Sequence, residues 1–214
     1  MNQIWLNAVR ASARAVALWW RAGGAPEPVA AYQPIGAASL AASYVNLANP
    51  GVFDAAPQST PVWSSAGWDM TTNWRLLTGI TGIAVGFDGW SMLVRFSAAS
   101  SAHSAFGVYN AAGNSFSIFP SLSSRVYYTI NQDNFITPAL TAGVLGIAGN
   151  TGYRNGSFDL ALSGGGNPTG QIVIGARNDT TSQFWSGVWE AGAIWDTTLT
   201  APQMAAVSAA MAAL

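Results

Sequence analysis

The amino-acid sequence predicts an all-β protein built as an antiparallel sandwich or barrel. From residue 38 to residue 196, apolar and polar residues alternate with the period of two that places successive side chains on opposite faces of a strand. Turn signals such as Asp88-Gly89 and Asn155-Gly156 divide this region at intervals of roughly ten residues, and no long helical pattern lies between them. Many short strands at this spacing are typical of antiparallel sheets.

The alternation is clearest in residues 90–97, where Met92, Val94 and Phe96 share one side of the predicted strand and Arg95 lies on the other. Residues 125–131 repeat the pattern, with Tyr128 on the apolar side. The remaining predicted strands are 83–87, 105–109, 115–119, 144–148, 157–162, 171–176 and 188–195.

Charge is scarce in this chain of 214 residues, because only 8% of them are Asp, Glu, Lys or Arg and every basic residue is Arg. An average globular chain has roughly a quarter. A net charge of −1 gives no electrostatic basis for a nucleic-acid partner. The absence of Cys excludes disulfides and a thiolate nucleophile, and the single His, His103, is assigned no role. So few charges suggest a surface that other subunits cover or that Ser, Thr, Asn and Gly form.

Residues 1–24 predict an N-terminal amphipathic helix. Five apolar residues of its face are expected to anchor the protein: Trp5, Val9, Val16, Trp19 and Trp20. Three interpretations stay open for this segment. It docks on a partner subunit, it packs on its own domain, or it acts as a membrane-surface helix or transit peptide. No apolar stretch is long enough for a membrane span.

Residues 25–37 predict a stiff linker, because they contain Pro26, Pro28 and Pro34. The predicted sandwich then occupies 38–214 and ends in a short helix. Thr200 and Gln203 form a capping-box pattern at the start of that helix. Its apolar stripe consists of Met204, Val207, Met211 and Leu214. This stripe is expected to pack on the sandwich or on a neighbouring subunit.

Residues 153–204 carry a series of short motifs in a fixed order. They are Tyr153-Arg154-Asn155-Gly156, Ile174-Gly175, Phe184-Trp185-Ser186-Gly187, Ala193-Ile194-Trp195 and Leu199-Thr200-Ala201-Pro202-Gln203. This order resembles the C-terminal half of laminin G-like domains of the concanavalin A-like lectin/glucanase superfamily. The resemblance implies a two-sheet antiparallel jelly-roll sandwich. It also implies a domain that binds glycans or proteins, in some members with calcium, or that hydrolyses glucans.

Glucan hydrolysis fits this sequence poorly. Glucanases of the superfamily present a Glu-x-Asp-x-Glu strand, because retaining hydrolysis needs two carboxyl groups on either side of the scissile bond. This chain contains only Glu27 and Glu190 as glutamates, and Glu190 is expected to be a rim carboxylate or to pair with an arginine. We therefore expect no enzyme and no catalytic residue.

Calcium is the one cofactor that the sequence leaves open, and no other is expected. Asp133-Asn134 and Asn178-Asp179 offer the oxygen ligands that a hard cation prefers. Asx residues also serve turns, so these two pairs alone do not define a metal site.

A glycan site needs an exposed aromatic ring beside hydrogen-bonding side chains. Asn178, Asp179 and Trp185 are the best candidates, and the tryptophans 63, 68 and 74 form a second group. Burial in the core or in an interface is the alternative for each of these indoles.

The overall design, an N-terminal helix followed by a Pro-rich segment and a low-charge sandwich, is similar to structural or adhesion proteins of tailed bacteriophages. That similarity predicts a non-enzymatic structural or decoration component of the virion. Its expected partners are other virion subunits and copies of itself. The alternative hypothesis is a lectin-like carbohydrate-binding module.

Overall fold

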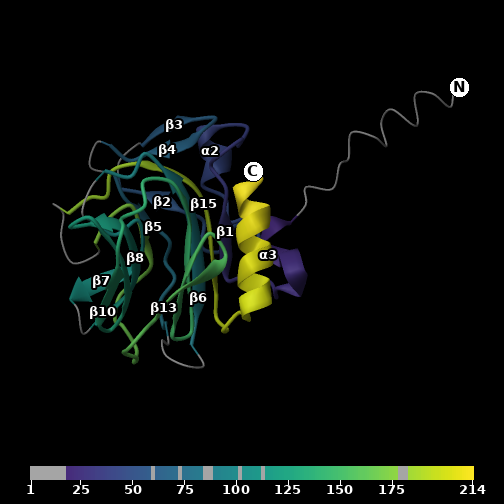
Figure 1. Cartoon of the computed structure of the whole chain (residues 1–214). Helices are drawn as coiled ribbons and strands as arrows, with labels where there is room; N and C mark the ends of the chain where they lie inside the picture. Colours follow the sequence, from purple (N-terminus) through teal and green to yellow (C-terminus); the bar gives the residue numbers. More distant parts are fainter. Residues whose placement is uncertain are drawn as a thin grey trace, which may run out of the picture.

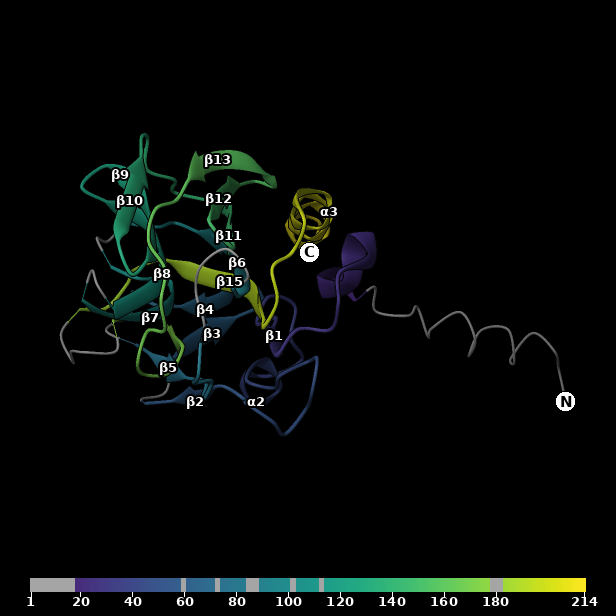
Figure 2. The ribbon, with the colours of Figure 1, turned by 90° about the horizontal axis from the view of Figure 1, so that it is seen from below.

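Two antiparallel sheets packed face to face form the body of the protein, and α3 and η1 lie outside one of them (Figures 1 and 2). These features come from a computed structural model of the chain. The structure describes residues 18–58, 61–71, 74–83, 89–100, 103–111, 114–177 and 183–214. Within them, no helix has the length and apolar character that crossing a membrane would require.

The first sheet has eight strands. In spatial order they are β13 (Ser157–Ala161), β12 (Thr151–Arg154), β11 (Gly143–Ala148), β6 (Ser91–Ser97), β15 (Val188–Trp195), β4 (Gly67–Asp69) and β3 (Val62–Ser64), with β1 (Ala30–Tyr32) paired to β15. The second sheet has seven strands. They are β10 (Asp133–Ile136), β9 (Arg125–Ile130), β8 (Asn114–Leu122), β7 (Phe106–Ala111), β14 (Val173–Ile174), β5 (Leu76–Leu77) and β2 (Ala56–Pro57).

The predicted fold class is confirmed, since the chain forms a two-sheet jelly-roll-like sandwich with a short C-terminal helix. Strand β15 has the predicted bounds, whereas β14 is shorter than predicted. The predicted strand 83–87 lies almost entirely outside the described residues.

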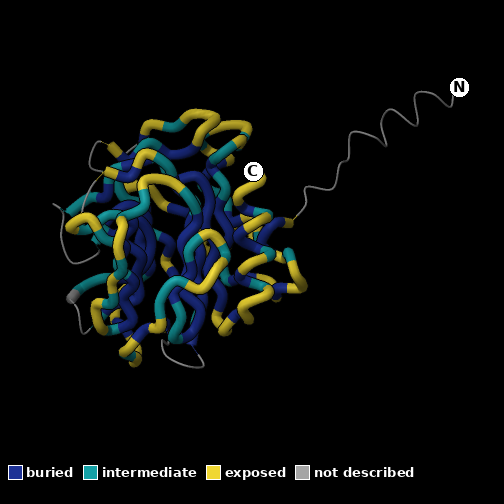
Figure 3. The backbone as a smooth tube through the Cα atoms, in the orientation of Figure 1, coloured by how far each residue is buried: buried dark blue, intermediate teal, exposed yellow. Residues whose placement is uncertain are grey.

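Strands β6 and β15 bury side chains on both faces. Met92, Val94 and Phe96 enter the core between the sheets, as the alternation predicts. Leu93 and Trp195 point the other way, into a second core formed with the helices. Figure 3 shows these central strands as mostly buried, with the exposed residues concentrated in the loops, the edge strands and the outer side of α3.

The C-terminal helix α3 (Ala201–Ala212) begins at the predicted cap. The Thr200 side chain accepts from the backbone N–H of Gln203, and the Gln203 side chain accepts from the backbone N–H of Thr200 at 2.9 Å. Three residues of the predicted stripe are buried against the eight-stranded sheet: Met204, Val207 and Met211. Leu214, beyond the end of the helix, is 38% exposed.

The described part of the predicted N-terminal helix is the 3-10 helix η1 (Trp19–Gly24). Trp19 and Trp20 are buried in the same core as α3, and their indole N–H groups donate to Gln33 and Glu27 at 2.9 and 3.1 Å. These two rings therefore pack on their own chain. The other three anchor residues predicted, Trp5, Val9 and Val16, lie outside the described residues.

The segment predicted as a linker, 25–37, contains a buried strand and so differs from the prediction. Strand β1 pairs with β15, with Ala30 opposite Ile194 and Tyr32 opposite Gly192. The prolines that suggested a linker flank this three-residue strand, where their missing N–H groups interrupt no ladder. The Tyr32 hydroxyl also donates to the Phe53 carbonyl at 2.5 Å.

The helix cap provides a test of how α3 is held. Thr200→Ala removes the acceptor of the capping box and should lower the free energy of unfolding by about 1 kcal/mol, measured by urea titration. Thr197→Ala, at a nearby exposed position, is the matched control. Equal effects of the two substitutions would show that the cap contributes nothing specific.

Candidate functional site

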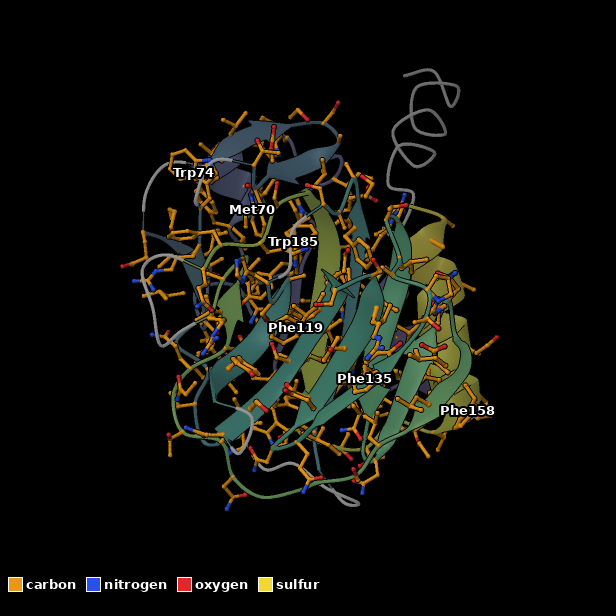
Figure 4. All side chains as sticks on the ribbon, turned by 60° about the vertical axis from the view of Figure 1, so that its left-hand side comes forward. Met70, Trp74, Phe119, Phe135, Phe158 and Trp185 are labelled. Atoms are coloured by element: carbon orange, nitrogen blue, oxygen red, sulfur yellow. The ribbon has the colours of Figure 1, made fainter. Side chains whose placement is uncertain are left out.

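The two sheets differ in what covers their outer faces. Helix α3 and η1 lie on the eight-stranded sheet, as Figure 2 shows, whereas no described helix lies on the outer face of the seven-stranded sheet. Strands β7 to β10 carry four aromatic residues on that outer face, which we call the aromatic strip: Tyr109, Phe119, Tyr127 and Phe135. In Figure 4, Phe119 and Phe135 are labelled on these strands.

Strand register brings the aromatic strip together. Tyr127 on β9 lies opposite Phe119 on β8 and opposite Phe135 on β10. The ring centroids of Tyr127 and Phe135 are 5.2 Å apart, and those of Tyr109 and Phe119 are 5.1 Å apart at a steep angle. Such offset and edge-to-face pairs are favourable beyond the area they bury.

Exposure of the strip is greatest at one end. Phe135 is 47% exposed, Tyr127 and Tyr109 are half-buried, and Phe119 is only 3% exposed. The Phe135 end therefore offers an apolar surface to a ligand, while Phe119 supports it from within the sheet.

Two arginines lie over the ends of the strip. The Arg125 guanidinium carbon is 4.4 Å from the centre of the Phe135 ring, and that of Arg177 is 4.4 Å from the centre of the Tyr109 ring. The positive charge is attracted to the electron-rich ring face. Arg177 also donates to the Asn110 carbonyl at 3.3 Å.

The neighbouring polar residues are Asp133 and His103. Asp133 is the outer-face residue of β10 next to Phe135, and it lies opposite Thr129. Partial burial raises the pKa of Asp133, and the positive charge of Arg177 opposes that shift. Burial, helped by the charge of Arg177, lowers the pKa of His103.

Strand β9 is fixed to the opposite sheet directly beneath the strip. Tyr128 points inward, and its hydroxyl lies 3.0 Å from the Tyr153 carbonyl and 2.8 Å from the Asp159 carboxylate. Asp159 also pairs with Arg154 at 3.2 Å. Burial and the charge of Asp159 raise the pKa of Tyr128, so its hydroxyl keeps its proton. Consecutive residues of β9 thus serve two purposes, Tyr127 presenting a ring and Tyr128 holding the strand.

The glycan site predicted around Asn178, Asp179 and Trp185 looks different in the structure. Asn178 and Asp179 lie outside the described residues. Trp185 is fully buried, and its ring contacts Phe96 edge to face at 6.1 Å. A ring in that position fills the space between the sheets and presents no face to a ligand.

The second tryptophan group also belongs largely to the core. Trp68 is fully buried, stacks on Trp189 at 5.1 Å and donates to the Ser43 hydroxyl at 2.8 Å. Trp63 and Trp74 are half-buried and pack against the same core.

Of the residues considered for calcium, Asn134 has other contacts, and Asn178-Asp179 lies outside the described residues. The Asn134 side chain bonds to both backbone groups of Ser163, at 2.8 and 3.0 Å, and so ties β10 to the chain that follows β13. Over the residues that the structure describes, His, Asp and Glu form no group of three that could hold a metal ion.

Both glutamates are paired. Glu190 forms an ion pair with Arg95 at 2.5 Å, which is one of the two alternatives expected for it, and Arg95 donates to the Met211 carbonyl at the end of α3 at 2.7 Å. Glu27 accepts from Trp20 and Arg21. Each carboxylate thus has a structural partner.

Sequence reasoning missed the aromatic strip. The signal was present at residues 127 and 128, because two consecutive tyrosines in a strand place one ring on each face. Phe135 was harder to find, since β10 has only four residues and no predicted strand covers it.

Comparisons with known proteins identify the fold and no family. No family model matches the chain, and no curated protein matches it. Among solved structures it is similar to domain 4 of AbnA, a GH43 extracellular arabinanase from Geobacillus stearothermophilus, in complex with arabinotriose. The TM-score is 0.57 at 12% identity, over 85% of this chain and 98% of that one.

Botulinum neurotoxin domains are similar as well. The receptor binding domain of neurotoxin D matches with a TM-score of 0.56 and 10% identity, over 86% of this chain and 52% of that one. The serotype D ligand binding domain in complex with N-acetylneuraminic acid matches with a TM-score of 0.53 and 11% identity, over 86% and 50% of the two chains. This chain therefore spans about half the length of the neurotoxin domains. These likenesses show a β-sandwich fold and carry no information on a bacteriophage origin.

The burial of Trp185 predicts a stability effect. Trp185→Ala should lower the free energy of unfolding by about 3–5 kcal/mol, because it leaves a cavity between the sheets. Val62→Ala, at a position that is 53% exposed, should cost less than about 1 kcal/mol in the same urea titration. A Trp185 variant as stable as the Val62 variant would place this indole at the surface.

Proposed function

We propose that this chain is a lectin-like carbohydrate-binding module that binds glycan on the outer face of its seven-stranded sheet. The observation that carries the proposal is the aromatic strip, whose Phe135 end is exposed on a face that the described helices leave open. A sugar ring has an apolar C–H face, and this face gains free energy when it leaves water to pack on an aromatic ring.

The groups around the strip suit the polar part of a sugar. The Arg125 guanidinium lies at the exposed end, and the Asp133 carboxylate lies on the other side of Phe135 along β10, within electrostatic reach of Arg177. Together they supply donors and acceptors for sugar hydroxyls. The anchoring of Tyr128 to the opposite sheet keeps β9 in place, so little order has to be gained on binding.

The comparisons support the same function. The arabinanase domain that this chain resembles over nearly its whole length was solved with a trisaccharide, and one neurotoxin domain was solved with a sialic acid. Which sugar each of those domains binds, and where it binds, are properties of those proteins. They favour a glycan as the class of ligand here.

The module is proposed to bind glycan without cleaving it. Retaining hydrolysis needs two carboxyl groups about 5 Å apart, one of them free to donate a proton. Glu190 is paired with Arg95, and Glu27 is paired with Arg21 far from the strip. Incubation of the protein with any glycan that it binds should release no sugar.

A role as a virion component, located in the virion with other subunits or further copies of the chain as partners, stays a prediction. It rests on the similarity of overall design to bacteriophage proteins. The described residues favour the module instead.

The binding test uses a glycan array followed by calorimetry on the glycans that bind. Phe135→Ala removes the exposed ring and should weaken binding about tenfold, equivalent to about 1.4 kcal/mol. Phe158→Ala is the matched control, because Phe158 is 67% exposed but lies on β13 of the other sheet (Figure 4). The proposal fails if no glycan binds, or if the two variants weaken binding equally.

A further inference from the structure

The position of Arg125 is set by a tight hairpin. Ser123 and Ser124 connect β8 to β9 and both have positive φ, at 51° and 62°, as a two-residue hairpin turn requires. Arg125 then begins β9, opposite Leu122 and on the same face as Tyr127. The turn thus places the guanidinium over the exposed end of the aromatic strip, with its carbon 4.4 Å from the centre of the Phe135 ring.

Arg125 differs in its partners from four other described arginines, Arg21, Arg95, Arg154 and Arg177. Three arginines form ion pairs: Arg21, Arg95 and Arg154. Arg177 donates to the Asn110 carbonyl and lies within electrostatic reach of Asp133. For the Arg125 side chain, the described part of the chain provides the Phe135 ring and neither a hydrogen bond nor an ion pair.

An arginine held on an aromatic surface without an anion has its hydrogen-bonding capacity unused. Its planar fork of N–H donors matches the two oxygens of a carboxylate, and such bidentate pairs are stronger than bonds between neutral groups. The partial burial of Arg125 against the ring limits screening of its charge by solvent.

We propose that the glycan bound by this face is acidic, and that Arg125 binds the carboxylate of a uronic or sialic acid while the sugar ring packs on Phe135 and Tyr127. This inference rests on the proposed function and adds the class of sugar to it. Arg125 thereby determines specificity, whereas Phe135 contributes to the binding of any sugar.

Two pairs of probes measure how much a carboxylate contributes to binding. Trigalacturonic acid differs from galactotriose by its carboxylates, and sialyllactose differs from lactose by an added acidic sugar. Calorimetry at low ionic strength should show the acidic member of at least one pair binding about tenfold more tightly than its neutral partner. High salt should reduce that preference in part, because salt still screens an ion pair that is only partly buried.

Arg125→Gln should weaken the acidic sugar far more than the neutral one, so that their affinities come within about twofold of each other, because the ring platform that both sugars use is intact. Arg21→Gln is the matched control, since it removes the same charge from η1 on the far side of the sandwich. Circular dichroism checks that both variants are folded.

Other outcomes overturn the inference in distinguishable ways. Equal binding of acidic and neutral sugars, with Phe135→Ala still weakening both, would refute the proposal that the ligand is acidic. It would not contradict the proposed function. Binding of a sulfated glycan in place of the carboxylated probes would refute the proposal that Arg125 binds a carboxylate. Binding of none of the probes or array glycans would refute both proposals.

Discussion

Burial of strands β6 and β15 on both faces is the constraint on which the rest of the structure depends. Their inward side chains fill the space between the sheets, where Trp189 packs on Trp68 and Phe106. Their outward side chains include apolar ones such as Leu93 and Trp195, which need a cover of their own. Helix α3 and η1 provide that cover, whereas no described helix covers the outer face of the seven-stranded sheet, where Phe135 is exposed.

The cover is held by a few polar contacts as well as by apolar packing. Arg95 is paired with Glu190 on β15, and it donates to the Met211 carbonyl, where a positive charge suits the negative end of the helix dipole. Gly146 lies under α3, where an added Cβ would come within 2.6 Å of the Met204 side chain. Among the described residues, Arg21, Arg95 and Arg154 each have a carboxylate partner, whereas the Arg125 guanidinium lies on the Phe135 ring.

Much of the fold could be predicted from the sequence because it depends on local patterns. Alternation located β6, β9 and β15, and the capping box located the start of α3. Strand β1 was missed because its flanking prolines indicate a linker unless the partner strand is known. The site was harder, since the choice between a buried ring such as Trp185 and an exposed one such as Phe135 depends on which strands become neighbours.

The central claim is that ligand binds where the helices leave a sheet uncovered. Nuclear magnetic resonance of the full ¹⁵N-labelled chain, titrated with trigalacturonic acid or with whichever array glycan binds, tests it most directly. The account predicts that backbone amide shifts change on β8, β9 and β10 around Phe119, Tyr127 and Phe135, while those of α3 stay in place. Shifts concentrated on α3, η1 or the edge strand β3 would contradict it.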